Sequence, residues 1–174
     1  MTVPRTRPAP QTVTAHPLHI ALDGSRSLYP AEFMLGDGYP TEADFTVSRK
    51  EDGKGLGVYA NRFFPRGYRI CRISGMVMHQ VMQHTLQINA DTHLYDPYFT
   101  GYLLHSCDPN GFLDMQRFEL WALKDIHPGE AMTMDYASTE DVLFKQFPCL
   151  CGAPNCRGWI SGRREPALRP VSAE

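Results

Sequence analysis

The sequence predicts a mainly β protein with few helices, and three observations support this fold class. Short apolar stretches recur from Phe45 onward, and glycine and proline, 14 of each, separate them as turn residues do. Only two segments space their apolar residues as a helix requires. Hydrophobic residues at 43% and charged residues at 21% of a 174-residue chain suit one folded domain with modest tails.

Each expected strand is a short apolar segment bounded by turn residues. In chain order, the expected strands cover residues 45–47, 58–60, 68–73, 118–123 and 131–134. Residues 118–123 are too continuously apolar for a sheet that exposes one face. Pro128 and Gly129 then form a turn, so we expect the last two strands to be neighbours.

The two expected helices cover residues 77–88 and 139–147. The first carries bulky apolar residues at roughly helical spacing. The second follows Ser138 as an N-cap, has acidic residues in its first turn, and ends before Pro148.

The charge balance and the ends of the chain limit partners and location. Seventeen basic and nineteen acidic side chains leave a net charge of −2, so we expect no nucleic-acid partner. No apolar run approaches the ~18 residues that span a bilayer, and no signal peptide is evident, so we expect an intracellular protein, cytoplasmic or nuclear, without membrane contact. Residues 1–42 are expected to form a partly disordered arm, with residues 1 to about 30 outside the core, and residues 163–174 a solvated tail.

Three cysteines form a C-x-C-x4-C array at Cys149, Cys151 and Cys156. Gly152 and Pro154 bend the chain inside the array, so the thiolates can converge on one ion, and this pattern predicts a zinc site. The alternative is three free thiols in a mobile tail.

A closed zinc site needs a fourth ligand from elsewhere in the chain. We expect Cys107 in this position because it lies in a polar turn, although a histidine could substitute. Cys71 lies in an apolar segment, where a cysteine is usually part of the core.

Together with the cysteine array and Arg157-Gly158, three segments resemble the SET-domain lysine methyltransferases that carry a post-SET zinc module. These segments are GKGLGVYA at residues 53–60, LHSCDPN at 104–110 and DIHPGEAMTMDY at 125–136, in the family's order. The resemblance covers roughly residues 43–162. It implies several small curved sheets, few short helices, and a knot-like crossing of the segments that contain His105 and Tyr136. It also implies a SET domain at residues 43–148 and a zinc module at 149–162.

The resemblance further implies methyl transfer from S-adenosylmethionine to the side-chain amine of a lysine in a protein substrate. Tyr136 matches the family's active-site tyrosine. The cofactor-binding positions it implies are Lys54, Gly55, Leu56, Gly57, Leu104, His105, Tyr136 and Leu150. Aromatic faces tolerate cations, so Tyr102 and Trp159 are candidates, together with Met134, for lining the lysine channel.

Two residues depart from the family's pattern. Leu104 stands where the family usually has an asparagine, and losing that amide's hydrogen bond would cost about 1.5 to 3 kcal/mol of cofactor binding. Met134 replaces the usual phenylalanine or tyrosine, so we expect more than one methyl group to be added.

Three other hypotheses stay open, namely a catalytically weak SET-like binding module, a methyltransferase acting on a small-molecule amine, and a zinc-ribbon interaction protein.

Overall fold

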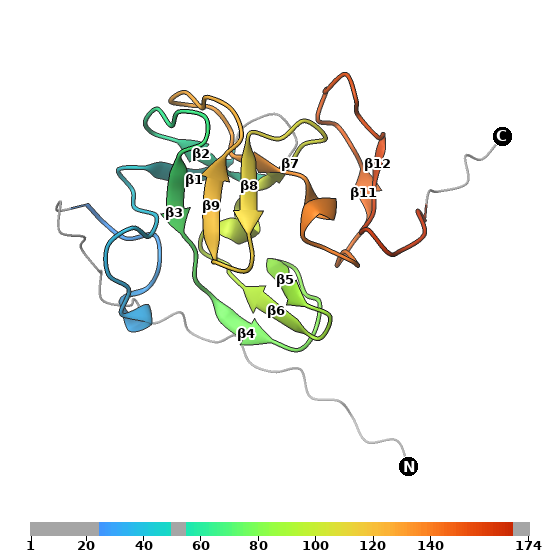
Figure 1. Ribbon diagram of the computed structural model, residues 1–174, viewed down its shortest axis with the longest axis horizontal. Coiled ribbons are helices and arrows are strands. Elements are labelled where there is room, and N and C mark those ends of the chain that lie inside the picture. The colour runs from blue at the N-terminus through green and yellow to red at the C-terminus, as the bar shows by residue number, and fades with distance from the viewer. Residues whose placement is uncertain (1–24, 50–54, 169–174) are drawn as a thin grey trace, which may run out of the picture.

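The computed structural model describes residues 25–49 and 55–168, which form small antiparallel and parallel sheets with three short 3-10 helices (Figure 1). The elements are η1 (Ala31–Phe33), β1 (Phe45–Arg49), β2 (Leu56–Ala60), β3 (Arg69–Arg72), β4 (Met76–Met78), β5 (Thr85–Asn89), β6 (Thr92–Tyr95), η2 (Thr100–Tyr102), β7 (Leu104–His105), β8 (Gly111–Asp114), β9 (Glu119–Ala122), β10 (Thr133–Met134), η3 (Tyr136–Ser138), β11 (Phe147–Pro148) and β12 (Trp159–Ile160). Within these residues, no helix is both long and apolar enough to cross a bilayer. The prediction of a mainly β protein with several small sheets is confirmed.

Five small sheets divide the strands among them. Strands β1 and β2 pair antiparallel, β9 lies between β3 and β8, and β6 lies between β4 and β5. Strands β11 and β12 form an antiparallel pair near the C-terminal end, whereas β7 and β10 pair in parallel. Because β7 and β10 are far apart in the sequence, their pairing brings two distant motifs side by side.

The expected pairing of the strands at residues 118–123 and 131–134 is wrong. The first contains β9, which pairs with β3 and β8, and the second contains β10, which pairs with β7. The turn between them is held by other chain segments, since Gly129 N–H donates to the Ala60 carbonyl at 2.7 Å and Ile126 exchanges hydrogen bonds with Phe64.

The core packs between the sheets and includes a cluster of aromatic rings. The Phe45 ring lies 5.3 Å from the ring of Phe64 and 4.8 Å from that of Phe99. Cys71 is buried in this core, as expected.

The prediction that residues 1 to about 30 lie outside the core is wrong for Tyr29, which is 2% exposed. Residues 1–24 lie outside the described residues.

The predicted helix at residues 77–88 is wrong, because the segment forms β4, a turn and the start of β5. Strand β6 offers backbone partners on both of its edges, and these long-range hydrogen bonds override the local apolar spacing. Val77, one of the bulky apolar residues of this segment, is 62% exposed.

The predicted helix at residues 139–147 is also wrong, because these residues form no helix and the short η3 ends before them at Ser138. The acidic residues that were expected to favour a first helical turn are used in tertiary contacts instead. Gln87 N–H donates to Glu140 Oε1 at 2.9 Å, and Gln87 Nε2 donates to Asp141 Oδ2 at 2.8 Å. These contacts hold the segment against β5.

Candidate active site and metal centre

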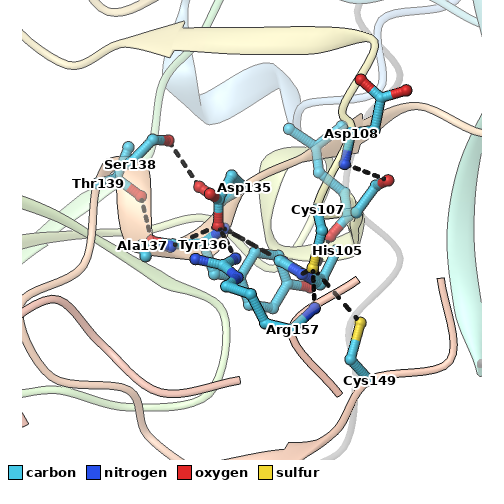
Figure 2. Close-up of polar contacts among 12 residues, drawn as sticks. His105, Cys107, Asp108, Asp135, Tyr136, Ala137, Ser138, Thr139, Cys149 and Arg157 are labelled. Atoms are coloured by element: carbon cyan, nitrogen blue, oxygen red, sulfur yellow. Dashed lines mark hydrogen bonds and ion pairs between the residues drawn. The ribbon is translucent and has the colours of Figure 1, made fainter. Parts of the chain in front are cut away.

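Four cysteine thiols converge at the C-terminal end of the fold. The Sγ atoms of Cys107, Cys149, Cys151 and Cys156 all lie within 4.8 Å of one another. Cys107 follows β7, and the other three lie between β11 and β12, so the cluster ties two parts of the chain together. Figure 2 shows the contact between Cys107 and Cys149. The structure thus brings together the four residues that the sequence predicted as metal ligands.

The donor set of this cluster fits zinc. Tetrahedral zinc with Zn–S bonds of about 2.3 Å places its sulfur ligands about 3.8 Å apart, and the Cys107 and Cys149 Sγ atoms are 3.9 Å apart. Backbone N–H groups donate to two of these sulfur atoms, whereas burial raises the pKa of Cys149 to about 12. The Arg157 N–H donates to Cys107 Sγ at 3.3 Å, and hydrogen bonds from the backbone of Cys107 and Ala153 lower the pKa of Cys151 to about 6.

His105 joins the cysteine cluster to the neighbouring pocket. Its Nδ1 accepts a hydrogen bond from the Tyr136 N–H at 3.3 Å, so the proton of the neutral ring lies on Nε2, which is 3.4 Å from Cys107 Sγ. Burial lowers the pKa of His105 to about 4, so the ring is neutral near pH 7. Asp135 lies beside this ring and pairs with Arg157, which extends the network across the site (Figure 2).

A smaller cavity of about 260 Å³ opens beside the cluster. It is lined by Leu104, His105, Tyr136, Phe147, Pro148, Cys149, Leu150 and Cys151. The rings of His105, Tyr136 and Phe147 meet edge to face, with centroids 5.2 to 6.1 Å apart. Leu150 is 74% exposed at the cavity's rim, so this is a partly apolar pocket with aromatic walls.

A larger cavity of about 450 Å³ opens beside β5, η2 and the segment after η3. Its lining consists of Val81, Met82, Gln83, His84, Thr85, Leu86, Thr100, Gly101, Leu103, Met134, Tyr136, Glu140, Leu143, Phe144 and Lys145. Tyr136 lines both cavities, so its side chain lies where the two approach each other.

The Tyr136 hydroxyl is fixed by one acceptor. It donates to the Leu103 carbonyl at 2.8 Å. Burial, together with the negative charge of Glu140, raises the pKa of Tyr136 to about 12. The phenol therefore remains protonated at physiological pH and acts as a hydrogen-bond donor of fixed direction.

The glycine motif also approaches the smaller cavity. A Cβ added to Gly57 would lie 3.0 Å from Leu104 Cδ1, so the Leu104 side chain packs directly on this glycine. Gly55 has a φ of +87°, a conformation that favours glycine, and Leu56 is partly exposed at the start of β2. Lys54, the remaining predicted residue of the motif, lies outside the described residues.

The predicted channel residues occupy different places. Met134 is buried and lines the larger cavity with Tyr136. The Tyr102 ring lies 4.8 Å from that of His84, a lining residue of the same cavity. Trp159 lies in β12, where its Nε1 donates to Gln146 Oε1 at 2.9 Å. All three channel assignments stay predictions.

Sequence reasoning missed the burial of Glu140 in the larger cavity and the contacts that Arg163 makes beside it. Glu140 is 5% exposed inside it, and burial raises its pKa to about 6. Arg163 was expected in a solvated tail, and that prediction is wrong. Its guanidinium donates to the carbonyls of Ser138 and Thr139 at 3.1 and 3.0 Å and pairs with Asp141. The spacing of charged residues along the sequence indicates neither the burial of Glu140 nor the contacts of Arg163.

Comparison with known proteins agrees with this geometry. Residues 55–137 match the family described as SET domain. Histone-lysine N-methyltransferase Set2 of Drosophila melanogaster is 30% identical over 137 residues, and the H3 lysine-9 specific histone-lysine N-methyltransferase of Schizosaccharomyces pombe is 29% identical over 157 residues. A crystal structure of KRYPTONITE in complex with mCHG DNA and SAH superposes on 66% of this chain with a TM-score of 0.56 and 28% identity.

The matched part is a minor share of each relative. Each of the two sequence matches covers 65% of this chain, but only 6% of the Drosophila protein and 32% of the fission-yeast protein. The KRYPTONITE match covers 28% of that chain. The family match includes residues 55–60 of the glycine motif, the β7 turn and Tyr136. Leu104 and His105 line the smaller cavity, and Tyr136 lines both cavities. Residues 55–137, just under half of the chain, therefore match the SET-domain family.

Proposed function

We propose that this protein is an S-adenosylmethionine-dependent methyltransferase that moves a methyl group to the side-chain amine of a lysine in a protein substrate. The observation that carries the proposal is that Tyr136 lines both cavities. A transfer enzyme needs a donor and an acceptor on either side of one reacting point. The smaller cavity would hold the donor and the larger one the lysine.

The smaller cavity suits an adenosyl cofactor. Phe147, His105 and Leu150 offer ring and apolar surfaces for a flat base. S-adenosylmethionine supplies an activated methyl group on a sulfonium when it is bound. SAH, the by-product of that cofactor, is named in the KRYPTONITE structure, which supports the same class of ligand here.

Tyr136 would orient the target amine and keep water away from it. Its phenol stays neutral because burial disfavours the phenolate, so it acts through position and hydrogen bonding rather than as a base. Met134 and Leu103 are buried next to it and supply an apolar wall of the larger cavity. Such a wall disfavours a charged ammonium and so favours the neutral amine that transfer requires.

The four clustered cysteines would hold one zinc ion in a post-SET module. Cys149 and Cys151 line the smaller cavity, whereas Cys107 belongs to the turn after β7. The metal would therefore fix the wall formed by residues 147–151 against the domain. Its role would be structural, because four thiolates leave no open coordination position.

Names of the relatives suggest the substrate and its location. Histone-lysine N-methyltransferases are among the relatives, so a histone lysine is the first substrate to test, in the nucleus or elsewhere inside the cell. KRYPTONITE was crystallised with DNA, whereas the net charge of −2 led us to expect no nucleic-acid partner. That expectation stays a prediction.

A catalytically weak binding module is the second candidate function, and Leu104 favours it. Its side chain packs on Gly57, at the position where the family's asparagine would help to hold the cofactor. A Leu104→Asn variant discriminates between the two. If the amide is needed, this variant binds S-adenosylmethionine at least about tenfold more tightly than the natural chain.

The decisive experiment measures binding and transfer together. The zinc-loaded protein is titrated with S-adenosylmethionine by calorimetry, and radiolabelled methyl transfer is then followed on histones and on free lysine. We expect micromolar binding and label on histone, with kcat lowered at least about a hundredfold in Tyr136→Phe. Tyr68→Phe, whose hydroxyl lines neither cavity, is the matched control.

Two outcomes would contradict the proposal. Absence of cofactor binding in both the natural chain and Leu104→Asn would leave a partner-binding module. Label on free lysine at a higher rate than on any protein would favour the small-molecule amine hypothesis.

A further inference from the structure

A buried carboxylate outside both cavities organises one wall of the larger cavity. Asp96 is 0% exposed and accepts five hydrogen bonds. Its donors are the N–H groups of Tyr98 (3.0 Å), Phe99 (3.0 Å) and Thr100 (2.8 Å), the Thr100 hydroxyl (2.5 Å) and the Tyr29 hydroxyl (2.7 Å). A carboxylate with this many donors fixes the backbone of the loop that follows it.

One of these donors comes from far away in the sequence. The Tyr29 hydroxyl donates to Asp96 and accepts from the Ser74 N–H at 3.0 Å, so its orientation is determined from both sides. The ring packs in an aromatic cluster with Phe33, Tyr39 and Tyr98. Tyr29 lies outside residues 55–137, which match the SET-domain family.

The loop that Asp96 fixes leads directly to the active-site tyrosine. Gly101 N–H donates to the Asp96 carbonyl at 3.1 Å, and Leu103 N–H donates to the Thr100 carbonyl at 3.1 Å. The Leu103 carbonyl in turn accepts the Tyr136 hydroxyl at 2.8 Å. The loop is closely packed at Gly101, where a Cβ would collide with the Asp96 carbonyl and with His84.

We propose that Tyr29 and Asp96 are positioning residues for Tyr136, so that the segment preceding the SET match completes the active site. The proposal rests on the transferase function proposed above. Tyr29 holds Asp96, Asp96 holds the turn at Thr100–Tyr102, and this turn aims the Leu103 carbonyl that orients the Tyr136 phenol.

Removing the Tyr29 hydroxyl should affect the larger cavity and leave the smaller one unchanged. The Ser74 N–H loses its acceptor and Asp96 loses one of its donors, so the carboxylate is free to move with its loop. Thr100, Gly101 and Leu103 line the larger cavity but not the smaller one. The change should therefore lower turnover and leave cofactor binding intact.

The test compares Tyr29→Phe with Tyr39→Phe in the full chain, using histone as methyl acceptor. Tyr39 lies in the same aromatic cluster, with its ring 6.2 Å from that of Tyr29, so both variants remove one hydroxyl from similar surroundings. In Tyr29→Phe we expect kcat to fall about tenfold while the Kd for S-adenosylmethionine changes by less than about twofold. Tyr39→Phe should keep both constants.

A second readout does not depend on turnover. 3-Fluorotyrosine is incorporated at position 136 alone, and its ¹⁹F resonance is recorded at pH 7 in both backgrounds. Tyr29→Phe should shift or broaden this resonance because the Leu103 acceptor is displaced, whereas Tyr39→Phe should leave it in place. Asp96→Asn should have a larger effect, measured below its own melting temperature.

The outcomes separate the two proposals. If the natural chain transfers no methyl group, the proposed function fails, and the ¹⁹F comparison alone decides the positioning role. An unchanged resonance in Tyr29→Phe overturns that role. So does a loss of kcat that follows the fraction of unfolded protein and vanishes on cooling, because it would mean that Tyr29 only stabilises the fold.

Discussion

Glu140 is a residue whose burial is costly to the fold. Its carboxyl lies inside the larger cavity, where burial raises its pKa from 4.5 to about 6 despite the hydrogen bond from the Gln87 N–H. The folded state therefore favours the protonated form. This contribution to stability is present in full below pH 4.5 and is lost as the pH rises through 6.

A Glu140→Gln variant should remove this cost while keeping an oxygen that can accept from Gln87. At pH 8 we expect its free energy of unfolding to exceed that of the natural chain by up to about 2 kcal/mol. At pH 4 the two should be equally stable. Urea denaturation at both values measures the difference, and a variant that is less stable at pH 8 would show that the charge itself is needed by the fold.

At the scale of elements, residues 162–165, which follow β12, bind to residues 138–143 beside the larger cavity. We call residues 162–165 the strap. Arg163 donates to the carbonyls of Ser138 and Thr139, and Glu165 accepts from Leu143 N–H at 3.1 Å and Gly162 N–H at 2.6 Å. Residues 139–143 form no helix that would satisfy these groups. The strap therefore replaces the hydrogen bonds that a helix would have provided.

Removing the strap's guanidinium should loosen that wall. We expect Arg163→Ala to lower the free energy of unfolding by about 1 kcal/mol or more, since two backbone carbonyls lose charged donors, and to raise the KM for histone several-fold. Arg164→Ala is the matched control, because this side chain is 78% exposed and pairs with Asp141 at 3.5 Å. Equal effects of the two substitutions would show that overall charge matters and not the strap.

For the whole molecule, the cysteine cluster is the point where the C-terminal segment is joined to the sheets. Cys107 follows β7, whereas Cys149 adjoins β11 and lines the smaller cavity. Among the described residues, β11 and β12 pair with each other and with no other strand. A metal ion would supply the missing stability.

Loss of the metal should therefore disable the cofactor site before it unfolds the domain. We expect Cys149→Ser to lose the one zinc ion per chain and to weaken S-adenosylmethionine binding at least about tenfold, because the wall at residues 147–151 detaches. Cys71→Ala, in the core, should lower the melting temperature and keep the metal. Metal analysis measures the bound zinc, and calorimetry measures the affinity for S-adenosylmethionine. Full cofactor affinity in zinc-free protein would contradict the expectation.

Short-range patterns in the sequence were enough to predict several parts of this protein. Apolar stretches bounded by glycine and proline predicted the mainly β fold, because strands are limited by local turn chemistry. The spacing of Cys149, Cys151 and Cys156 predicted a thiol cluster, because three donors within one turn cannot lie far apart. The glycine motif, the β7 turn and the Tyr136 segment indicated the family, because their order is a property of the chain itself.

Only the tertiary structure decided which partners those residues have. Residues 77–88 and 139–147 have helical signals, but backbone groups of β6 and side chains of Gln87 and Arg163 hold them in other conformations. The links from Tyr29 to Asp96 and onward to Tyr136 are equally invisible in the sequence. Hydrogen bonds between residues tens of positions apart have no period along the chain, so they can be recognised only after the fold has brought their atoms together.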